Sequence, residues 1–256
     1  MGTSSLVFNH KQLEMARSGF EFKYIVKEDT ILFNFQGKEI RMRDADYNGD
    51  IVGVFYREEY KNLDVKNKTV IDIGASIGDT AIYFALKGAR NVIAFEPYPK
   101  TFQSAMLNVQ NNLIGNAVKI INGGYGPDLK IRVDPNRRAI GSTSLQSAKD
   151  DWQEIELFSL KTIANMFDLQ NAVLKMDCEG CEYHLLNEDP ETLNIFSQIQ
   201  IEYHYGYKNL IEYLSEAGFD VDYTNPSRYY NKEAENPNME IGMITARKSP
   251  GLSNAI

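Results

Sequence analysis

From residue 67 onward, short apolar runs alternate with longer segments in which apolar residues recur every three or four positions. The short runs have the length and composition of buried strands, and the periodic segments are typical of amphipathic helices. Strands that alternate with helices in this way predict an α/β fold with a mostly parallel, doubly wound sheet. The predicted strands cover residues 69–73, 91–95, 117–121, 172–176, 197–203, 219–223 and 240–247, and the predicted helices cover 78–87, 99–113, 160–167 and 206–217. Short strands are also expected at 129–133 and 155–158.

The first 66 residues show a different pattern, in which apolar and polar positions alternate. This period of two predicts a small antiparallel β-meander with one buried face, built from residues 20–26, 31–35 and 40–42. So few strands are marginally stable alone, so their apolar face is expected to rest on the main domain. We therefore divide the chain into a β-rich N-terminal cap (1–66), a main domain (67–248) and a tail (249–256). We expect the cap and the loops 134–150 and 224–238 to shape a substrate pocket.

Composition and charge narrow the range of partners. The chain of 256 residues has 43% hydrophobic and 24% charged residues, and its net charge is −8. This acidic balance argues against nucleic acid and anionic membranes as main partners. No apolar run approaches the length of a membrane span and no signal-peptide pattern is present, so a cytoplasmic location is expected.

The two cysteines, Cys178 and Cys181, are too few for a disulfide framework, and no second pair of ligands accompanies them for a zinc site. We expect them to fill small apolar spaces in a reducing compartment.

The most informative segment runs from Asp72 to Asp79, where a predicted strand ends in an acid and turns through Gly74, Ser76 and Gly78 into a predicted helix. Backbone N–H groups at such a helix start point toward a bound ligand. A dinucleotide site requires glycine in the middle position of this loop, which holds Ser76, and a third glycine where Asp79 stands. The acids Asp72 and Asp79 would repel a pyrophosphate but suit the ammonium and sulfonium groups of S-adenosylmethionine (SAM).

This loop resembles motif I of class I methyltransferases, which have a Rossmann-like sheet and pack the loop against the methionine part of SAM. The resemblance extends to Glu96, which ends the next strand and matches the acid that accepts both ribose hydroxyls. Pro97 would flank the adenine, and Asn122 and Gly123 follow the third strand where such enzymes contact the adenine edge. The expected cofactor-binding residues are Asp72, Gly74, Ser76, Gly78, Glu96, Pro97, Asn122, Gly123 and Asp177.

A second group of ionisable residues follows the strands 172–176 and 197–203. Lys175 lies inside a run that predicts a buried strand, where an unpaired lysine is rare. The acids Asp177, Glu179 and Glu182 come directly after it, and Glu202 and His204 lie at the end of the next strand. Ligands bind at the carboxyl ends of parallel strands, so these residues are the candidates for catalysis.

Taken together, these segments resemble the FkbM family of methyltransferases. The resemblance covers about residues 67–205 and rests on Asp72–Asp79, Phe95-Glu96-Pro97, the Asp177-x-Glu179-Gly180-x-Glu182 block and Ile201–His204. It implies SAM-dependent O-methylation of small molecules, typically of sugar or polyketide hydroxyls. The chain departs from the family pattern at Ser76, where Asn is expected, and in the helix 160–167, which lacks a Leu-Asp pair.

For in-line transfer of a methyl group to a hydroxyl, His204 is the expected general base and Glu202 is placed to orient it. We expect Asp177 beside the cofactor amino group and the reaction centre, Glu179 and Glu182 on substrate hydroxyls, and Lys175 either holding the carboxylates or acting as the base. The main hypothesis includes no metal.

Three alternatives remain open from the residues alone. In the first, Asp177, Glu179, Glu202 and His204 hold a divalent cation that makes the substrate hydroxyl more acidic. The second is a non-catalytic SAM- or nucleoside-binding module, which would not require so many ionisable residues. The third is a nicotinamide oxidoreductase, which Ser76 and Asp79 disfavour.

Overall fold

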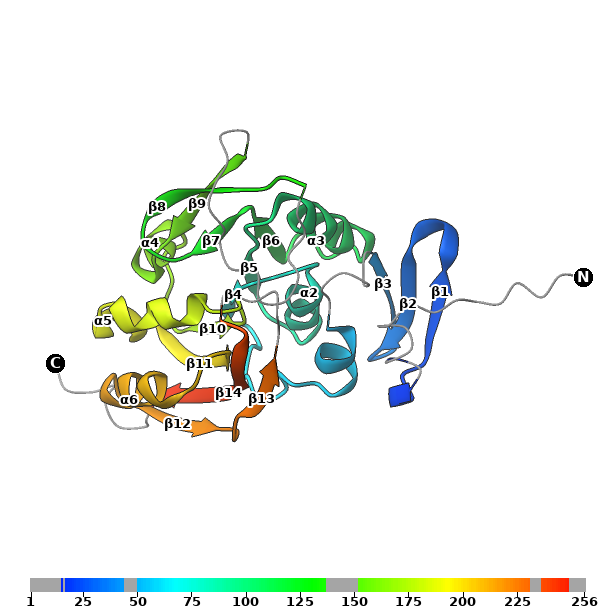
Figure 1. The fold of residues 1–256 in the computed structure, drawn as a ribbon. Helices are drawn as coiled ribbons and strands as arrows, with labels where there is room; N and C mark the ends of the chain where they lie inside the picture. The colour runs from blue at the N-terminus through cyan, green and yellow to red at the C-terminus, as the bar shows by residue number, and fades with distance from the viewer. Residues whose placement is uncertain (1–14, 16, 44–49, 137–151, 231–235, 249–256) are drawn as a thin grey trace, which may run out of the picture.

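The computed structural model describes residues 15, 17–43, 50–136, 152–230 and 236–248. Its centre is a twisted sheet with helices on both faces, and a small separate sheet from the N-terminal segment lies beside one helical layer (Figure 1). The predicted α/β fold with a mostly parallel sheet is therefore confirmed. The sequence also predicts weak helical character over residues 4–18. This segment and the predicted loop 134–150 fall mostly outside the described residues.

The strand order of the central sheet is β12-β14-β11-β10-β4-β5-β6, and β13 pairs with β14 outside this path. Neighbouring strands are parallel from β11 to β6, whereas β14 runs antiparallel to both β11 and β12. The strands are β4 (Thr69–Ile73), β5 (Asn91–Phe95), β6 (Val118–Ile121), β10 (Ala172–Met176), β11 (Phe196–Tyr203), β12 (Phe219–Tyr223), β13 (Ser227–Tyr230) and β14 (Asn238–Lys248).

The direction of chain progression reverses between β4 and β10. From β4 the chain moves outward to β5 and β6, and it later returns to β10 on the other side of β4 before moving to β11. Loops diverge at such a switch point and leave room for a ligand at the carboxyl ends of the strands. Both groups of residues singled out in the sequence lie at this edge, because β4, β10 and β11 end immediately before them.

Two helical layers cover the sheet. The helices α2 (Asp79–Leu86) and α3 (Pro99–Asn111) contribute to one apolar core, and α4 (Leu160–Met166), α5 (Pro190–Leu193) and α6 (Lys208–Glu216) contribute to the other. The amphipathic pattern explains this placement, since α6 buries Leu210 and Leu214 while its polar residues face outward. A 3₁₀ helix, η3 (Cys181–Asn187), links β10 to α5.

A three-stranded sheet with the order β7-β9-β8 extends the edge beyond β6. The predicted strands at 129–133 and 155–158 correspond to β8 (Leu129–Val133) and β9 (Gln153–Phe158). The short strand β7 (Gly123–Tyr125), which pairs parallel with β9, was not predicted because its Gly-Gly-Tyr sequence lacks an alternating pattern. The strand β13 was likewise not predicted, since it lies within the segment 224–238 that we expected to be a loop.

The N-terminal sheet consists of β1 (Phe22–Ile25), β2 (Thr30–Phe35) and β3 (Lys38–Arg43), paired antiparallel. A 3₁₀ turn, η1 (Val26–Glu28), joins β1 to β2, and residues 52–56 form a π-helical turn, η2 (Val52–Tyr56). The buried face packs toward α2 through aromatic contacts such as Phe35–Tyr83, whose ring centroids are 5.6 Å apart. The side chains of Asn108 on α3 and of Asn112, the residue that follows α3, also bond to the backbone of β3.

In the part of the chain that the structure describes, no helix is both long enough and apolar enough to cross a membrane.

Candidate active site

The loop between β4 and α2 is built on two glycines with left-handed backbones. Gly74 has φ +78° and Gly78 has φ +85°, a region that residues with a side chain rarely adopt. The amides of Gly74 and Ala75 both donate to the carbonyl of Phe95 at the end of β5. A Cβ atom on Gly74 would lie 1.8 Å from the backbone oxygen of Asp177. Glycine at this position therefore allows the loop to lie directly against the residue that follows β10.

A buried ion pair joins the same two strands. The Nζ of Lys175 lies 2.9 Å from Asp72 Oδ1 and donates to the carbonyl of Gly74 at 2.9 Å. Both side chains are almost completely buried, and Thr80 donates to the other Asp72 oxygen at 2.6 Å. Burial alone would lower the pKa of Lys175, but the charges of Asp72 and Asp177 raise it above its usual value. Lys175 therefore keeps its proton at neutral pH and holds the loop in place, which does not suit a general base.

Glu96 lies at the end of β5 with its carboxylate held by the backbone. One oxygen accepts the Ser76 amide at 3.1 Å and the other accepts the Tyr98 amide at 2.9 Å. Burial raises the pKa of Glu96 to about 8, although these two hydrogen bonds oppose the shift. The nearby Asn122 donates to the carbonyls of Glu96 and Pro97, so its side chain supports the turn after β5.

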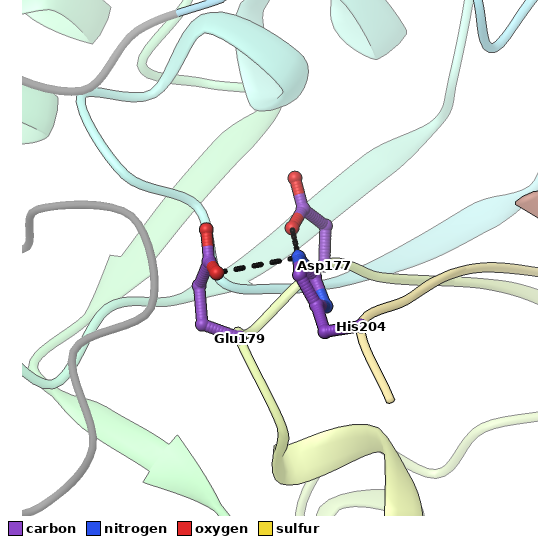
Figure 2. A group of neighbouring side chains, drawn as sticks. All are labelled: Asp177, Glu179 and His204. Atoms are coloured by element: carbon purple, nitrogen blue, oxygen red, sulfur yellow. Dashed lines mark ion pairs between the residues drawn. The ribbon is translucent and has the colours of Figure 1, made fainter. Parts of the chain in front are cut away.

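The acids that follow β10 converge on a histidine from the neighbouring strand, and we call Asp177, Glu179, Glu182, Glu202 and His204 the His204 cluster. Figure 2 shows Asp177 and Glu179 on one side of the His204 ring. The Nε2 atom lies 3.3 Å from a Glu179 oxygen and 3.8 Å from an Asp177 oxygen. Glu179 has a left-handed backbone, with φ 60°. Strain of this kind occurs often at functional sites.

The other ring nitrogen of His204 contacts Glu182, not Glu202. Its Nδ1 is 2.9 Å from Glu182 Oε1, which also accepts the His204 backbone amide. Glu182 is fully buried, so it lies behind the imidazole and does not reach a substrate as we expected from the sequence. The sequence pattern could not predict this contact, because it depends on how η3, which carries Glu182, lies against the end of β11.

Glu202 instead lies against Asp177. The charge of Asp177, followed by burial, raises the pKa of Glu202 to about 9. The negative charge of Asp177 therefore favours the protonated form of Glu202 at neutral pH.

His204 is 3% exposed and surrounded by negative charge. Burial alone would lower its pKa, but the hydrogen bond and charge of Glu182, with the charges of Glu179 and Asp177, raise the pKa to about 10. The site thus has strongly perturbed ionisable groups in direct contact, a property common at catalytic centres.

The expectation that the two cysteines are free thiols was wrong. Cys178 and Cys181 form a disulfide rather than filling apolar spaces as free thiols, and their Cα atoms are 5.4 Å apart. The turn at Glu179 and Gly180 brings them together, since both residues have positive φ. This disulfide therefore encloses the segment that carries Glu179.

A cleft of about 500 Å³ lies next to the His204 cluster, lined by residues that include Tyr205, Arg228, Tyr229, Tyr230, Met239 and Glu240. Its wall is joined to the strand end that carries the cluster, because the Glu240 amide donates to the His204 carbonyl at 2.9 Å. The ring of Tyr205 also lies beside Gly180, since a Cβ on that glycine would be 3.3 Å away. The sequence pattern did not indicate these tyrosines, because their position depends on the β13–β14 pairing.

Comparison with known proteins decides the family. The family model of the methyltransferase FkbM domain matches residues 72–221, more than half of the chain. The chain belongs to the FkbM methyltransferase family. Both groups of ionisable residues lie inside the matched region, and the protein is a SAM-dependent methyltransferase.

A viral protein is among the relatives of this methyltransferase. "Uncharacterized protein 158B" of Sulfolobus islandicus rod-shaped virus 1 is 28% identical over 176 residues, which cover 68% of this chain and 85% of that protein. Among solved structures, Trm5b from Pyrococcus abyssi is similar with a TM-score of 0.50 and 12% identity, over 86% of this chain and 56% of that one. M. jannaschii TYW2 in complex with AdoMet has a TM-score of 0.45 and 14% identity, over 87% and 88% of the two chains.

The cofactor is SAM, as predicted from the loop. The donor set of this structure fits it, because the partly exposed carboxylates of Asp177 and Glu179 supply negative charge at the switch point for a cationic cofactor. Glu96 offers a carboxylate whose orientation is already held by two amides. Gly74 allows the backbone of Asp177 to lie directly against the cofactor loop.

Proposed function

We propose that this methyltransferase transfers the methyl group of SAM to a hydroxyl of a small molecule, with the hydroxyl proton passing to the His204 cluster. The observation that supports the proposal is the direct contact between the two parts of the site. The loop residue Gly74 lies against Asp177, and Asp177 in turn faces Nε2 of His204. A proton-accepting group thus lies next to the cofactor loop.

Methyl transfer to an alcohol has two requirements. The oxygen must be held in line with the methyl–sulfur bond, and orientation of this kind can supply roughly 7–11 kcal/mol. SAM supplies the electrophilic methyl group, and the chain must bind the acceptor and take its proton. General-base assistance typically contributes about 10²–10⁴-fold in rate.

His204 is the group whose usual pKa best suits the role of base. In the cofactor-free structure the surrounding carboxylates keep it protonated, since its pKa is about 10. A positive charge bound beside Asp177 and Glu179 would offset their effect on the imidazole and lower this pKa. Glu182 keeps Nε2 directed toward the site throughout, because it holds Nδ1 from the buried side.

The cleft beside Tyr205 supports a small polyhydroxylated acceptor. Its walls combine tyrosine rings with the charged groups of Arg228 and Glu240, which are 3.7 Å apart. Aromatic faces with nearby hydrogen-bonding groups suit a sugar-like ring. The negative charge of the His204 cluster would repel a phosphate backbone, which disfavours a nucleic acid in this cleft.

Transfer of a labelled methyl group tests the proposal. The full chain is incubated with methyl-labelled SAM and a cell extract separated into small-molecule, RNA and protein fractions. We expect label in the small-molecule fraction and a loss of roughly 10²–10⁴-fold in rate for His204→Ala. Label confined to RNA or protein would overturn the assignment of the acceptor.

A thermal-shift experiment separates this function from the alternatives. S-adenosylhomocysteine (SAH) and SAM are expected to raise the melting temperature, whereas NAD and NADP are not. SAM binding without label transfer to any fraction would indicate a non-catalytic module.

A further inference from the structure

We propose that Asp177, Glu179 and His204 form a binding site for one divalent cation, such as Mn²⁺ or Mg²⁺. The proposal gives the cation a role in the methyl transfer proposed above, but the binding itself does not depend on that reaction. One ligand atom from each of the three residues lies within 4.8 Å of the others. Figure 2 shows the ion pairs that join both acids to the same ring nitrogen of His204.

The distances in this group suit a metal better than direct hydrogen bonds. Nε2 of His204 is 3.3 Å from Glu179 and 3.8 Å from Asp177, beyond the usual N–H···O range of about 2.7–3.2 Å. Ligands bound at about 2.1 Å in tetrahedral or octahedral geometry lie about 3.0–3.4 Å apart. The Glu179 distance falls in this range, and the Asp177 distance lies just beyond it, so cation binding requires the Asp177 side chain to move closer.

The support behind His204 is a second and independent observation. The imidazole is 3% exposed, and its Nδ1 bonds to the fully buried Glu182. Metal-binding histidines almost always donate their other ring N–H to a carboxylate or carbonyl in this way. A cation that displaces the Nε2 proton would leave the other proton on Nδ1, held by Glu182, and would meet the Nε2 lone pair on the side of the two acids.

The excess of negative charge around the group also favours a bound cation. The His204 cluster contains four carboxyl groups and one imidazole, and the nearby Lys175 is already paired with Asp72. A divalent cation between Asp177 and Glu179 would balance this excess of negative charge. Carboxylate oxygens suit Mn²⁺ and Mg²⁺, and the imidazole nitrogen favours a transition-metal ion, so this ligand set fits Mn²⁺ better than Mg²⁺.

A cation at this position would make His204 a ligand rather than the base. An acceptor hydroxyl beside the cation would become more acidic. Its proton would pass to a carboxylate of the cluster as the oxygen forms its bond to the methyl group. The methyl–sulfur bond would break, and SAH would leave.

Mn²⁺ binding to the metal-stripped full chain tests the site by electron paramagnetic resonance. We expect about one bound Mn²⁺ per chain, displaced by excess Mg²⁺. His204→Asn and Glu179→Gln should each weaken binding more than tenfold, and Glu182→Gln should weaken it by roughly 10–100-fold through the orientation of His204. The control Glu28→Gln, whose side chain is exposed and paired with Arg41, should bind as the wild type does.

Two results would overturn the proposal: the wild type binds no stoichiometric Mn²⁺, or the His204 and Glu179 variants bind it unchanged. SAH binding by each variant verifies that the fold and the cofactor loop are intact. Methyl transfer that persists in EDTA, without Mn²⁺ binding, would reject the cation but keep the proposed function. Mn²⁺ binding without methyl transfer would support the cation site and reject the proposed function.

Discussion

Gly74 shows how one missing side chain brings the two halves of the site together. Its backbone has φ +78°, and the space where a Cβ would lie is occupied by the backbone oxygen of Asp177. Gly37 has almost the same backbone, with φ +80°, but no atom lies within 4 Å of its Cβ position. Both glycines therefore need a left-handed backbone, but only at Gly74 would a side chain also clash with a neighbouring residue.

We predict that Gly74→Ala abolishes SAH binding and lowers the free energy of unfolding by more than Gly37→Ala does. The left-handed conformation costs alanine about 1–2 kcal/mol at either position, and only Gly74 adds a clash with Asp177. Urea unfolding and calorimetric titration with SAH measure the two effects. Equal losses of stability, with SAH binding retained in both variants, would contradict this explanation.

Glu96 predicts a pH dependence of cofactor binding. Burial raises its pKa to about 8, and the ionised form is the better acceptor for two ribose hydroxyls. SAH affinity should therefore rise by roughly tenfold or more between about pH 6 and pH 9, with release of a proton on binding near neutral pH. Titration calorimetry in buffers of different ionisation enthalpy measures both quantities. In Glu96→Gln the pH dependence should flatten, and an unchanged profile would reject the role of this residue.

At the scale of elements, α3 connects the N-terminal sheet to the cofactor loop. Asn108 accepts from the Arg43 amide and donates to the carbonyls of Arg43 and Ile77. Asn112, one turn later, bonds to the amide and carbonyl of Arg41 but does not contact the loop. One helix face thus links β3 to the turn that precedes α2.

Replacing Asn108 and Asn112 one at a time distinguishes the bond to the cofactor loop from the bonds to β3. We expect Asn108→Ala to lower the free energy of unfolding by about 1–3 kcal/mol, because buried polar groups lose their partners, and also to weaken SAH binding. Asn112→Ala should lower stability while SAH affinity stays close to that of the wild type. Equal SAH affinity in both variants would show that the bond to Ile77 does not position the loop.

The Cys178–Cys181 disulfide should stabilise the turn that carries Glu179. Closing so short a loop contributes about 2 kcal/mol in the chain-entropy model, which corresponds to roughly 4–8 °C in melting temperature for a chain of this size. We expect a reductant to lower the melting temperature of the wild type by this amount. The Cys178→Ser/Cys181→Ser variant should melt at the lower temperature and show no response to reductant. A wild type insensitive to reductant would contradict the prediction.

At the scale of the whole molecule, buried ionisable groups set how stability changes with pH. Burial raises the pKa of Asp79 to about 7 and that of Glu96 to about 8, and the charge of Asp177 raises that of Glu202 to about 9. His204 also has a raised pKa, about 10, because its carboxylate partners outweigh burial. At a pH between the unfolded-state and folded-state pKa of each group, the folded chain therefore binds more protons than the unfolded chain.

The cofactor-free protein should therefore lose stability steadily as pH rises from about 5 to about 10. The contribution of each acid to the free energy of unfolding falls as pH rises from its unfolded pKa to its folded pKa of about 7, 8 or 9. The contribution of His204 falls in the same way between its usual pKa and about 10. Urea unfolding across this range measures the slope, which should be smaller in the Asp79→Asn/Glu96→Gln variant. Stability that stays constant or rises over this range would contradict the prediction.

The sequence predicted most of the central sheet and its helices, because their periodicity is local and strong. The positions of β4, β5 and β10 agree with the expected ranges to the residue. The pattern did not predict β7 or β13, since a short Gly-rich strand and an exposed hairpin carry little periodicity. The residues of the His204 cluster were also expected at one edge, but their pairing within it was not.

By itself, the sequence determined the α/β fold, the cofactor and the edge of the sheet that carries the ionisable residues. These follow from periodicity and from residues close together in the chain. Tertiary structure decided that Glu182 holds His204, that Lys175 pairs with Asp72, and that Asp177 fills the space left by Gly74. The reason is that these contacts depend on the register between β4, β10 and β11, which joins residues far apart in the chain.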